Sequence, residues 1–257
     1  MPDQVVILCG GLGTRLGDES EVRPKPMVEI GGKPILWHIM KLYSHHGFTD
    51  FVLCLGYKGD VIRQYFLNYH LMNSDVRVKL GTNQLEPLEM FHDERDWSVV
   101  LAETGPGTLT AGRLRQAARY VDGSRFMVAY GDSLANVDLR ALMAFHDAQG
   151  KLATVTGILP VTRFGELRVD GNLVTEFIEK PKLSEGRLNG GFFVFERGVI
   201  DYLDDGPLER EPLTRLAKDG QLAVYRHDGY WFAMDTIREK RILEDEWASG
   251  RAPWKVW

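Results

Sequence analysis

The stretch at residues 8–15 reads LCGGLGTR, and a second stretch at residues 23–27 reads RPKPM. The preceding run QVVIL, residues 4–8, is largely apolar and β-branched, which is typical of a buried β-strand. Glycines that follow a strand directly let backbone N–H groups approach an oxygen-rich ligand without obstruction by Cβ atoms. We therefore predict a phosphate-binding loop at the end of the first strand of an α/β sheet.

The glycine pattern does not identify a ligand by itself. Gly10, Gly11 and Gly13 match neither the G-x-G-x-x-G dinucleotide fingerprint nor the Walker sequence, and a tight turn would use the same residues. Two nearby cations favour phosphate, because Arg15 offers a planar fork of donors and Lys25 is a point charge held between two prolines. Such a pair fits a nucleoside triphosphate, whereas the alternative is a charged loop in contact with solvent.

The composition is that of an ordinary globular chain and disfavours several classes of protein. Of the 257 residues, 44% are hydrophobic and 26% are charged, and no apolar run is long enough to span a membrane. A formal net charge of −5 disfavours a broadly basic surface for nucleic acid. Cys9 and Cys54 lie in apolar runs, which predicts core residues rather than a disulfide framework or a metal cluster. Because the N-terminal stretch has the pattern of a strand rather than a secretory signal, we expect a cytoplasmic protein without a membrane partner.

Strand-like runs alternate with amphipathic helix-like segments over the first 160 residues. This alternation predicts βαβ units and therefore an α/β fold with a Rossmann-like, mostly parallel sheet. From about residue 161 the chain changes to short strands and tight turns, with a hairpin signal at Asp170-Gly171. We expect a single domain over residues 1–257, with a nucleotide-binding core at about 1–160 and a small β-rich part with a C-terminal helix at about 161–257.

Two further segments have less regular patterns. Residues 81–96, GTNQLEPLEMFHDERD, follow neither the helical nor the strand period. They predict a long excursion, either a lid-like loop or a surface loop without a catalytic role. The C-terminal run RAPWKVW, residues 251–257, contains two tryptophans, which predicts docking on this subunit or on a neighbour.

Two aspartates follow apolar runs in positions suited to ligand binding. The run RFMVAYGD, residues 125–132, leads from a strand into Asp132, at the carboxyl end where open α/β sheets place their ligand crevice. Asp235 similarly ends the run YWFAMD at residues 230–235. Because Asp235 also precedes the helical segment TIREKRILEDEW, N-capping is at least an equal alternative to metal binding.

These motifs, taken in order, resemble those of the sugar-1-phosphate nucleotidylyltransferases. The similarity begins with GGLGTRL and RPKPMVEIGGKPILWHIM and continues through CLGYKGDVIRQYF, ETGPGTLTAGRL, YGD, RFGEL, EKP, NGGFFV, MDT and ASGRAPWKVW. It covers almost the whole chain and is greatest with the cytidylyltransferase branch, which joins CTP to glucose 1-phosphate. The resemblance implies attack of a phosphate oxygen of this small-molecule acceptor on the α-phosphorus of the triphosphate, with Mg²⁺ as cofactor and pyrophosphate as leaving group. It also implies a homo-oligomer.

The resemblance further implies roles for individual residues. Asp132 and Asp235 would be joint ligands of Mg²⁺, and Arg15, Lys25 and Asp132 would carry catalysis. The nucleotide site would consist of Leu8, Gly10, Gly11, Gly13, Thr14, Arg15, Lys25, Thr104, Gly105, Arg113 and Asp132. The acceptor site, in the β-rich part and next to it, would consist of Tyr130, Glu179, Lys180, Asn189 and Gly190. Without the resemblance, the Glu-Lys pair in FIEKP would be interpreted as an exposed neutral feature.

The chain departs from the family pattern at Ala111, Ser133, Asn136, Glu166, Phe232 and Ala233. We expect these segments to line the nucleotide and acceptor pockets, where loss of a hydrogen-bonding group changes specificity strongly. Another phosphorylated acceptor or another NTP therefore stays open, as does drift at neutral positions. Two rival functions are a nucleotide-linked oxidoreductase, which the glycine spacing disfavours, and a catalytically idle nucleotide-binding paralogue, which the retained cations and aspartates disfavour.

Overall fold

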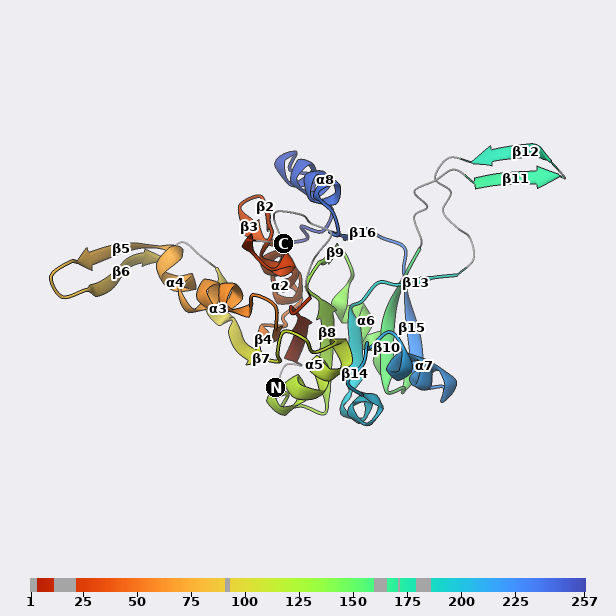
Figure 1. Ribbon diagram of the computed structural model, residues 1–257, viewed down its shortest axis with the longest axis horizontal. Coiled ribbons are helices and arrows are strands. Elements are labelled where there is room, and N and C mark those ends of the chain that lie inside the picture. The colour runs from red at the N-terminus through yellow and green to blue at the C-terminus, as the bar shows by residue number, and fades with distance from the viewer. Residues whose placement is uncertain (1–3, 12–21, 91–92, 160–165, 171, 179–185) are drawn as a thin grey trace.

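The computed structural model describes residues 4–11, 22–90, 93–159, 166–170, 172–178 and 186–257. Its centre is an eight-stranded sheet in the order β13-β10-β14-β8-β1-β4-β7, and β15 also pairs with β10 (Figure 1). Two hydrophobic clusters, one on each face, join this sheet to the helices. The predicted Rossmann-like, mostly parallel α/β fold is confirmed.

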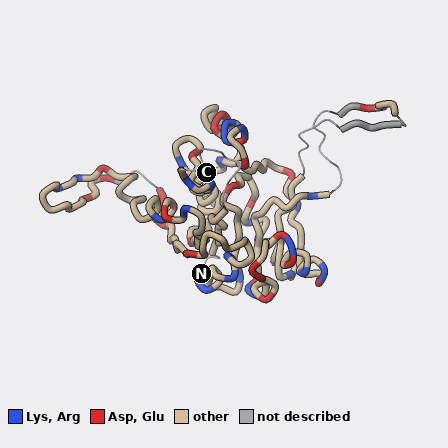
Figure 2. Tube along the Cα trace, in the orientation of Figure 1, with Lys and Arg blue, Asp and Glu red and all other residues tan. Residues whose placement is uncertain are grey.

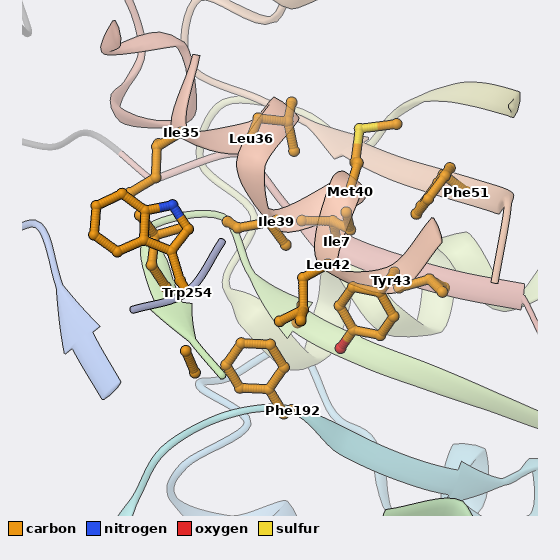
Figure 3. Packing of buried hydrophobic residues seen from close by; sticks show 14 of the residues in the cluster. Ile7, Ile35, Leu36, Ile39, Met40, Leu42, Tyr43, Phe51, Phe192 and Trp254 are labelled. Carbon is orange, nitrogen blue, oxygen red and sulfur yellow. The ribbon is translucent and has the colours of Figure 1, made fainter. Parts of the chain in front are cut away.

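The parallel half of the sheet contains β1 (Gln4–Leu8), β4 (Asp50–Leu55), β7 (Ser98–Glu103) and β8 (Arg125–Tyr130). The helices between these strands are α2 (Ile35–His45), α3 (Gly59–Leu67) and α5 (Thr110–Ala117). Every residue of β1 is buried, which explains its continuous apolar run. Successive side chains point to opposite faces, so Val5 and Ile7 join the cluster of α2 while Val6 and Leu8 join that of α5. Figure 3 shows Ile7 packed among side chains of α2.

Later strands form the other half of the sheet: β10 (Ala153–Ile158), β13 (Leu188–Asn189), β14 (Phe193–Glu196) and β15 (Leu222–His227). Strand β14 runs antiparallel between β8 and β10, whereas β15 runs parallel to β10. The helical segments of this half are α6 (Leu139–Gln149), η5 (Arg197–Tyr202) and α7 (Glu211–Lys218), whereas η4 (Ala118–Tyr120) follows α5 directly and precedes β8. C-terminal strands thus complete the central sheet, and the division near residue 160 stays a proposal.

Short elements outside the central sheet position the site. The one-turn 3₁₀ helix η2 (Lys25–Met27) precedes the paired strands β2 (Glu29–Ile30) and β3 (Lys33–Pro34). Strand β9 (Ser133–Ala135) pairs with β16 (Trp231–Ala233). Strands β11 (Glu166–Asp170) and β12 (Leu173–Ile178) pair antiparallel, so the two strands that flank the predicted hairpin turn are present.

The predicted long excursion at residues 81–96 is present, but the prediction that it is a loop is wrong, because most of it forms a strand and a 3₁₀ turn. Strand β6 (Gln84–Met90) pairs antiparallel with β5 (Ser74–Lys79), and this hairpin projects from the body of the molecule beyond α4 (Tyr69–Met72) (Figure 1). The described side chains of both strands are largely exposed. No buried face therefore imposes the alternation of apolar and polar residues that identifies a strand. A 3₁₀ turn, η3 (Glu94–Asp96), follows the hairpin.

The C-terminal segment packs on its own subunit. Of the two predicted alternatives, this subunit or a neighbour, the first is confirmed. Trp254 is 1% exposed and lies beside α2 (Figure 3). Its ring stacks on that of Trp247, from α8 (Ile237–Ala248), with centroids 6.4 Å apart. The tail thereby joins the last helix to the core of the sheet.

The cysteines and the surface agree with the composition. Cys9 and Cys54 are both buried and free, as predicted for core residues. Figure 2 shows Lys and Arg interspersed with Asp and Glu along the described chain. Within the described ranges, no helix combines the length and the apolar character needed to cross a membrane.

Candidate active site

The two aspartates predicted as metal ligands lie side by side although they are far apart in the sequence. Strand β9 begins directly after Asp132, and β16 ends two residues before Asp235. The two strands pair antiparallel with Ser133 opposite Ala233, and the N–H of Met234 donates to the carbonyl of Asp132 at 3.0 Å. This pairing brings both carboxylates to the same end of the small sheet.

Lys25 lies between these two carboxylates. Its Nζ donates to Oδ2 of Asp132 and to Oδ1 of Asp235, each at 2.6 Å. The Lys25 side chain is 12% exposed. Burial alone would lower the pKa of Lys25, but the attraction of both carboxylates outweighs it, and the pKa is raised above its ordinary value. One protonated ammonium is therefore shared by two carboxylates.

The prolines around Lys25 hold it in this place. A Cβ at Gly131 would lie 3.0 Å from Cγ of Pro26 and 2.8 Å from the carbonyl oxygen of Leu8. Gly131 thus lets the proline turn and the end of β1 approach the backbone immediately before Asp132. The sequence PKP fixes the backbone, and Gly131 provides the room that brings Lys25 to the carboxylates.

Asp235 is not the N-cap of the last helix, so the capping alternative is wrong. Thr236 caps α8, because its hydroxyl accepts from the N–H of Glu239 at 3.3 Å. The Glu239 carboxylate in turn accepts from the N–H groups of Thr236 at 2.9 Å and Asp235 at 2.7 Å. This capping box satisfies the helix terminus without the Asp235 carboxylate, which bonds Lys25 instead.

A cavity of about 490 Å³ lies beside the charged group of Lys25 and Asp132. It is at the carboxyl ends of β1 and β8, where open α/β sheets bind their ligands. Its lining residues are Leu8, Gly10, Gly11, Lys25, Pro26, Pro106, Gly107, Thr108, Leu109, Thr110, Arg113, Tyr130, Gly131 and Asp132. The described part of the predicted phosphate loop therefore shares one cavity with two of the three predicted catalytic residues.

Arg113 supports this cavity from within the core. Its side chain is 4% exposed, and its guanidinium donates to the carbonyl oxygens of Leu55 at 2.9 Å, Gly10 at 3.0 Å and Pro106 at 3.4 Å. It also donates to the hydroxyl of Thr104 at 2.7 Å. Burial lowers the pKa of Arg113, yet a guanidinium stays charged at neutral pH. Arg113 thus ties together two loops that line the cavity.

Glycines leave the room that the Arg113 guanidinium occupies. A Cβ at Gly10 would lie 2.1 Å from Cζ of Arg113, and one at Gly56 would lie 2.4 Å from its Nη1. Among the described residues, a Cβ at Gly11 would meet no heavy atom within 4 Å. Gly10 therefore serves the packing of Arg113, whereas Gly11 leaves its backbone open toward the cavity.

Three residues of the predicted nucleotide site come from segment 104–113, and of these Arg113 lines the cavity while Thr104 and Gly105 lie beside the lining. Thr104 is 3% exposed, and its hydroxyl donates to the carbonyl of Leu55 at 2.6 Å. Gly105 has a φ of +87°, which favours glycine, and it turns the chain into the lining segment 106–110.

Two residues predicted for the acceptor site contact each other. The Nδ2 of Asn189 donates to the hydroxyl of Tyr130 at 3.2 Å. Gly190 is buried, with its N–H donating to Thr156 at 2.9 Å and its carbonyl accepting from Nε1 of Trp231 at 2.7 Å. Gly190 therefore supports the segment that carries Asn189 and is not part of the lining of the described cavity.

Comparison with known proteins identifies the chain. The family described as Nucleotidyl transferase matches residues 4–235, a range that includes the cavity, Lys25 and both aspartates. The chain belongs to the nucleotidyl transferase family. It is 50% identical over 259 residues to the glucose-1-phosphate cytidylyltransferase of Salmonella typhi, covering 99% of each chain. It is 46% identical over 257 residues to the probable glucose-1-phosphate cytidylyltransferase of Bacillus subtilis (strain 168), covering 99% of this chain and 100% of the other.

Solved structures share the fold of this nucleotidyl transferase. The crystal structure of HddC from Yersinia pseudotuberculosis matches with a TM-score of 0.69 at 24% identity, over 95% of this chain and 99% of the other. Membership of the family identifies the chain as an enzyme and removes the oxidoreductase alternative. Five predicted site residues of the enzyme lie outside the described residues, and their roles stay predictions: Gly13, Thr14, Arg15, Glu179 and Lys180.

The described departures from the family pattern do not line the cavity of this nucleotidyl transferase. Phe232 packs against the hydrophobic core, and Oδ1 of Asn136 accepts from the N–H of Tyr230 at 2.8 Å. Ser133 is the departure that contacts a predicted metal ligand, because its hydroxyl donates to Oδ1 of Asp132 at 3.0 Å. The others are Ala111 and Ala233, and the side chain of Glu166 lies outside the described ones.

Sequence reasoning did not single out Glu209 or Thr110. The hydroxyl of Tyr130 donates to Oε1 of Glu209 at 2.6 Å, and that of Thr110 donates to Oε2 at 3.0 Å. The second glycine-rich turn, ETGPGTLT, signals a loop that ends at Thr110. Nothing in the run LEREP marks Glu209, because its partners come from distant parts of the chain.

Proposed function

We propose that this enzyme joins CTP to glucose 1-phosphate, giving CDP-glucose and pyrophosphate. The observation that carries the proposal is the 50% identity to a glucose-1-phosphate cytidylyltransferase over 99% of both chains. The cavity of about 490 Å³ beside Lys25 and Asp132 supports it, because it offers a cation and backbone N–H groups to an anionic substrate.

The proposed reaction exchanges one phosphoanhydride bond for another. A phosphate oxygen of glucose 1-phosphate forms a bond to the α-phosphorus of CTP. The bond from that phosphorus to the bridging oxygen breaks, and pyrophosphate leaves with the electron pair. Such a transfer depends on positioning and on neutralisation of negative charge rather than on a nucleophilic side chain.

Asp132 and Asp235 fit the Mg²⁺ ion that the family resemblance implies. Their oxygens converge on one cation, the Nζ of Lys25, at 2.6 Å each. Carboxylate oxygen is the ligand type that Mg²⁺ prefers, and one or two carboxylates suffice where phosphates and water complete the octahedron. Bound by these two residues, Mg²⁺ would supply charge neutralisation to the phosphates.

Lys25 and the glycine loop would act on the substrate directly. The pKa of Lys25 is raised by the two carboxylates, so the ammonium stays protonated and can exchange carboxylate oxygens for phosphate oxygens. The backbone of Gly11, which is open toward the cavity, would donate to the phosphates. Arg113 would act indirectly, because it fixes the carbonyl of Gly10 and thereby the orientation of the loop.

A second candidate is the same transfer with another acceptor or another NTP. It is favoured by the departures from the family pattern, of which Ser133 contacts Asp132. Pyrophosphate release with CTP, UTP, dTTP, ATP and GTP, each paired with several sugar 1-phosphates and small non-sugar phosphates, separates the two. We expect the highest kcat/KM for CTP with glucose 1-phosphate. A higher kcat/KM for another pair would identify that pair as the substrates. No pyrophosphate release with any pair would favour the catalytically idle paralogue.

The homo-oligomer and the cytoplasmic location expected from the sequence also stay proposals. Analytical ultracentrifugation of the full chain tests the first. A mass corresponding to several copies of the 29.1 kDa chain is the expected result, and a single species of 29.1 kDa would contradict it.

A further inference from the structure

A carboxylate at the rim of the cavity connects two of its walls. Glu209 precedes α7, and its two oxygens accept from the hydroxyls of Tyr130 at 2.6 Å and Thr110 at 3.0 Å. Tyr130 ends β8 and Thr110 begins α5, and both residues line the cavity. Glu209 itself is exposed and is not one of the lining residues, so it adjoins the cavity through the hydroxyls of these two residues.

The hydrogen bonds on the Tyr130 side all run toward Glu209. The N–H of Gly191 donates to Oδ1 of Asn189 at 2.9 Å, which leaves Nδ2 of that amide to donate to Tyr130 at 3.2 Å. The Tyr130 hydroxyl then donates to Glu209. Since a backbone N–H can only donate, the N–H of Gly191 fixes the donor and acceptor of each hydrogen bond in this series.

The Thr110 side has the same direction. The N–H of Leu208 donates to the Thr110 hydroxyl at 2.7 Å, so that hydroxyl uses its own proton toward Glu209. Burial, and next the charge of Glu209, raises the pKa of Tyr130 above its ordinary value, so the phenol stays a donor at neutral pH. Both series of hydrogen bonds therefore end at Glu209, whose carboxylate accepts in each.

Within the part of the chain that the structure describes, two hydroxyls bond the Glu209 carboxylate and leave some of its lone-pair positions without a hydrogen bond. A carboxylate has about four lone-pair positions, and the hydroxyls of Tyr130 and Thr110 take two. A group that only accepts hydrogen bonds recognises a donor, and its negative charge would repel a phosphate. The part of a substrate that it suits is a neutral hydroxylated region away from the phosphates.

We propose that Glu209 is a specificity-determining residue that accepts a hydrogen bond from a substrate hydroxyl at the rim of the cavity. The proposal rests on the proposed function, in which both substrates carry such hydroxyls. One source is the sugar ring of the acceptor, and the other is the ribose of the nucleotide. Glu209 would act by discriminating between hydroxylated and deoxygenated substrates.

The test compares wild-type enzyme with Glu209→Gln in steady-state kinetics. For the substrate that bonds Glu209, we expect KM to rise about 10- to 100-fold, because hydrogen bonds to charged groups are the strong ones, while kcat changes less. Deoxyglucose 1-phosphates and deoxyribose analogues of CTP locate the hydroxyl. The analogue that lacks the recognised hydroxyl should have a high KM with the wild type. Its KM should rise little further with Glu209→Gln.

Two controls separate recognition from a structural effect. Glu211→Gln changes a second exposed carboxylate, at the start of α7, and is expected to leave both KM values unchanged. Thr110→Val removes one of the two hydrogen bonds to Glu209 but leaves the charge of Glu209 in place. This variant should therefore raise the same KM by a smaller factor. Equal KM values in wild type and Glu209→Gln, or equal losses for every analogue in both proteins, would overturn the proposal.

Calorimetric titration of each substrate into wild type and Glu209→Gln gives a readout that does not depend on turnover. If CTP and glucose 1-phosphate are not turned over but one of them binds more weakly to the variant, the proposed function fails while the role of Glu209 stands. If both substrates are turned over, and neither their binding nor their KM changes in Glu209→Gln, the proposed function stands and the role of Glu209 fails. Failure of the wild type to bind any hydroxylated phosphate would overturn both.

Discussion

His38 is expected to make the protein less stable as the pH falls below about 6.5. Its side chain is fully buried in α2 and contacts the rings of Trp247 and Trp254. Nε2 lies 2.8 Å from the carbonyl oxygen of Ile30, which can only accept, so Nε2 carries the proton. Nδ1 then accepts from Nε1 of Trp254 at 3.4 Å, and protonation of Nδ1 would set two N–H groups against each other.

The pKa of His38 sets the size and the direction of the effect. Burial is the main cause that lowers it from 6.5 to about 4, and the charges of Lys255 and Lys33 act in the same direction. Between these values the unfolded chain binds a proton that the folded chain does not. The stabilisation is therefore complete above pH 6.5 and is lost as the pH falls toward 4. At about 1.4 kcal/mol for each pH unit, the total loss is about 3 kcal/mol.

Urea unfolding of wild type and His38→Gln between about pH 7.5 and about pH 4.5 measures this loss. Glutamine retains an N–H donor for the Ile30 carbonyl but does not titrate. Over this range the wild type should lose about 2 to 3 kcal/mol more stability than the variant, because the two proteins differ only at His38 and all other contributions cancel. Parallel stability curves would refute the reasoning. His45→Gln, at the exposed end of α2, is the matched control and should follow the wild type.

Three further substitutions test the site and its support. Asp132→Asn should lower kcat by about 100-fold or more with the unfolding midpoint nearly unchanged, and near-normal turnover would remove Asp132 from the mechanism. Gly10→Ala should cost about 1 to 3 kcal/mol of stability, because its Cβ would lie 2.1 Å from the Arg113 guanidinium; an equal effect of Gly11→Ala in the same assay would contradict this cause. Thr236→Ala should cost about 1 kcal/mol by removing the capping hydroxyl of α8, which an unchanged unfolding midpoint would exclude.

Burial determines which parts of the fold can be predicted from the sequence. All of β1 is buried, so its sequence is a continuous apolar run and the strand is evident. The β5–β6 hairpin is exposed on both faces, so its residues carry no period and its second strand resembles a loop. The placement of β14 between β8 and β10 has no local signal either, because it depends on pairing between distant segments.

The role of Asp235 could have been decided from a signal that is present in the sequence. The run Thr236-Ile-Arg-Glu239 has the S/T-x-x-E form of a capping box, which assigns the cap to Thr236 and frees the preceding carboxylate. That Asp235 and Asp132 share Lys25 could not be found in the same way. It follows from the pairing of β16 with β9, and neither three-residue strand has a pattern of its own.

The glycine loop shows how one motif can have two physical causes. A strand followed by glycines predicts a phosphate site. Gly11 fits that interpretation because its backbone borders the cavity and no described residue lies where its Cβ would be. Gly10 is a glycine for a different reason, since the guanidinium of Arg113 occupies the space of its Cβ and holds its carbonyl. The loop is therefore shaped by a cation that lies behind it in the core, in addition to any cation that faces the ligand. Because that cation bonds carbonyls on two loops, Gly10 and Pro106 are held relative to each other before any substrate arrives.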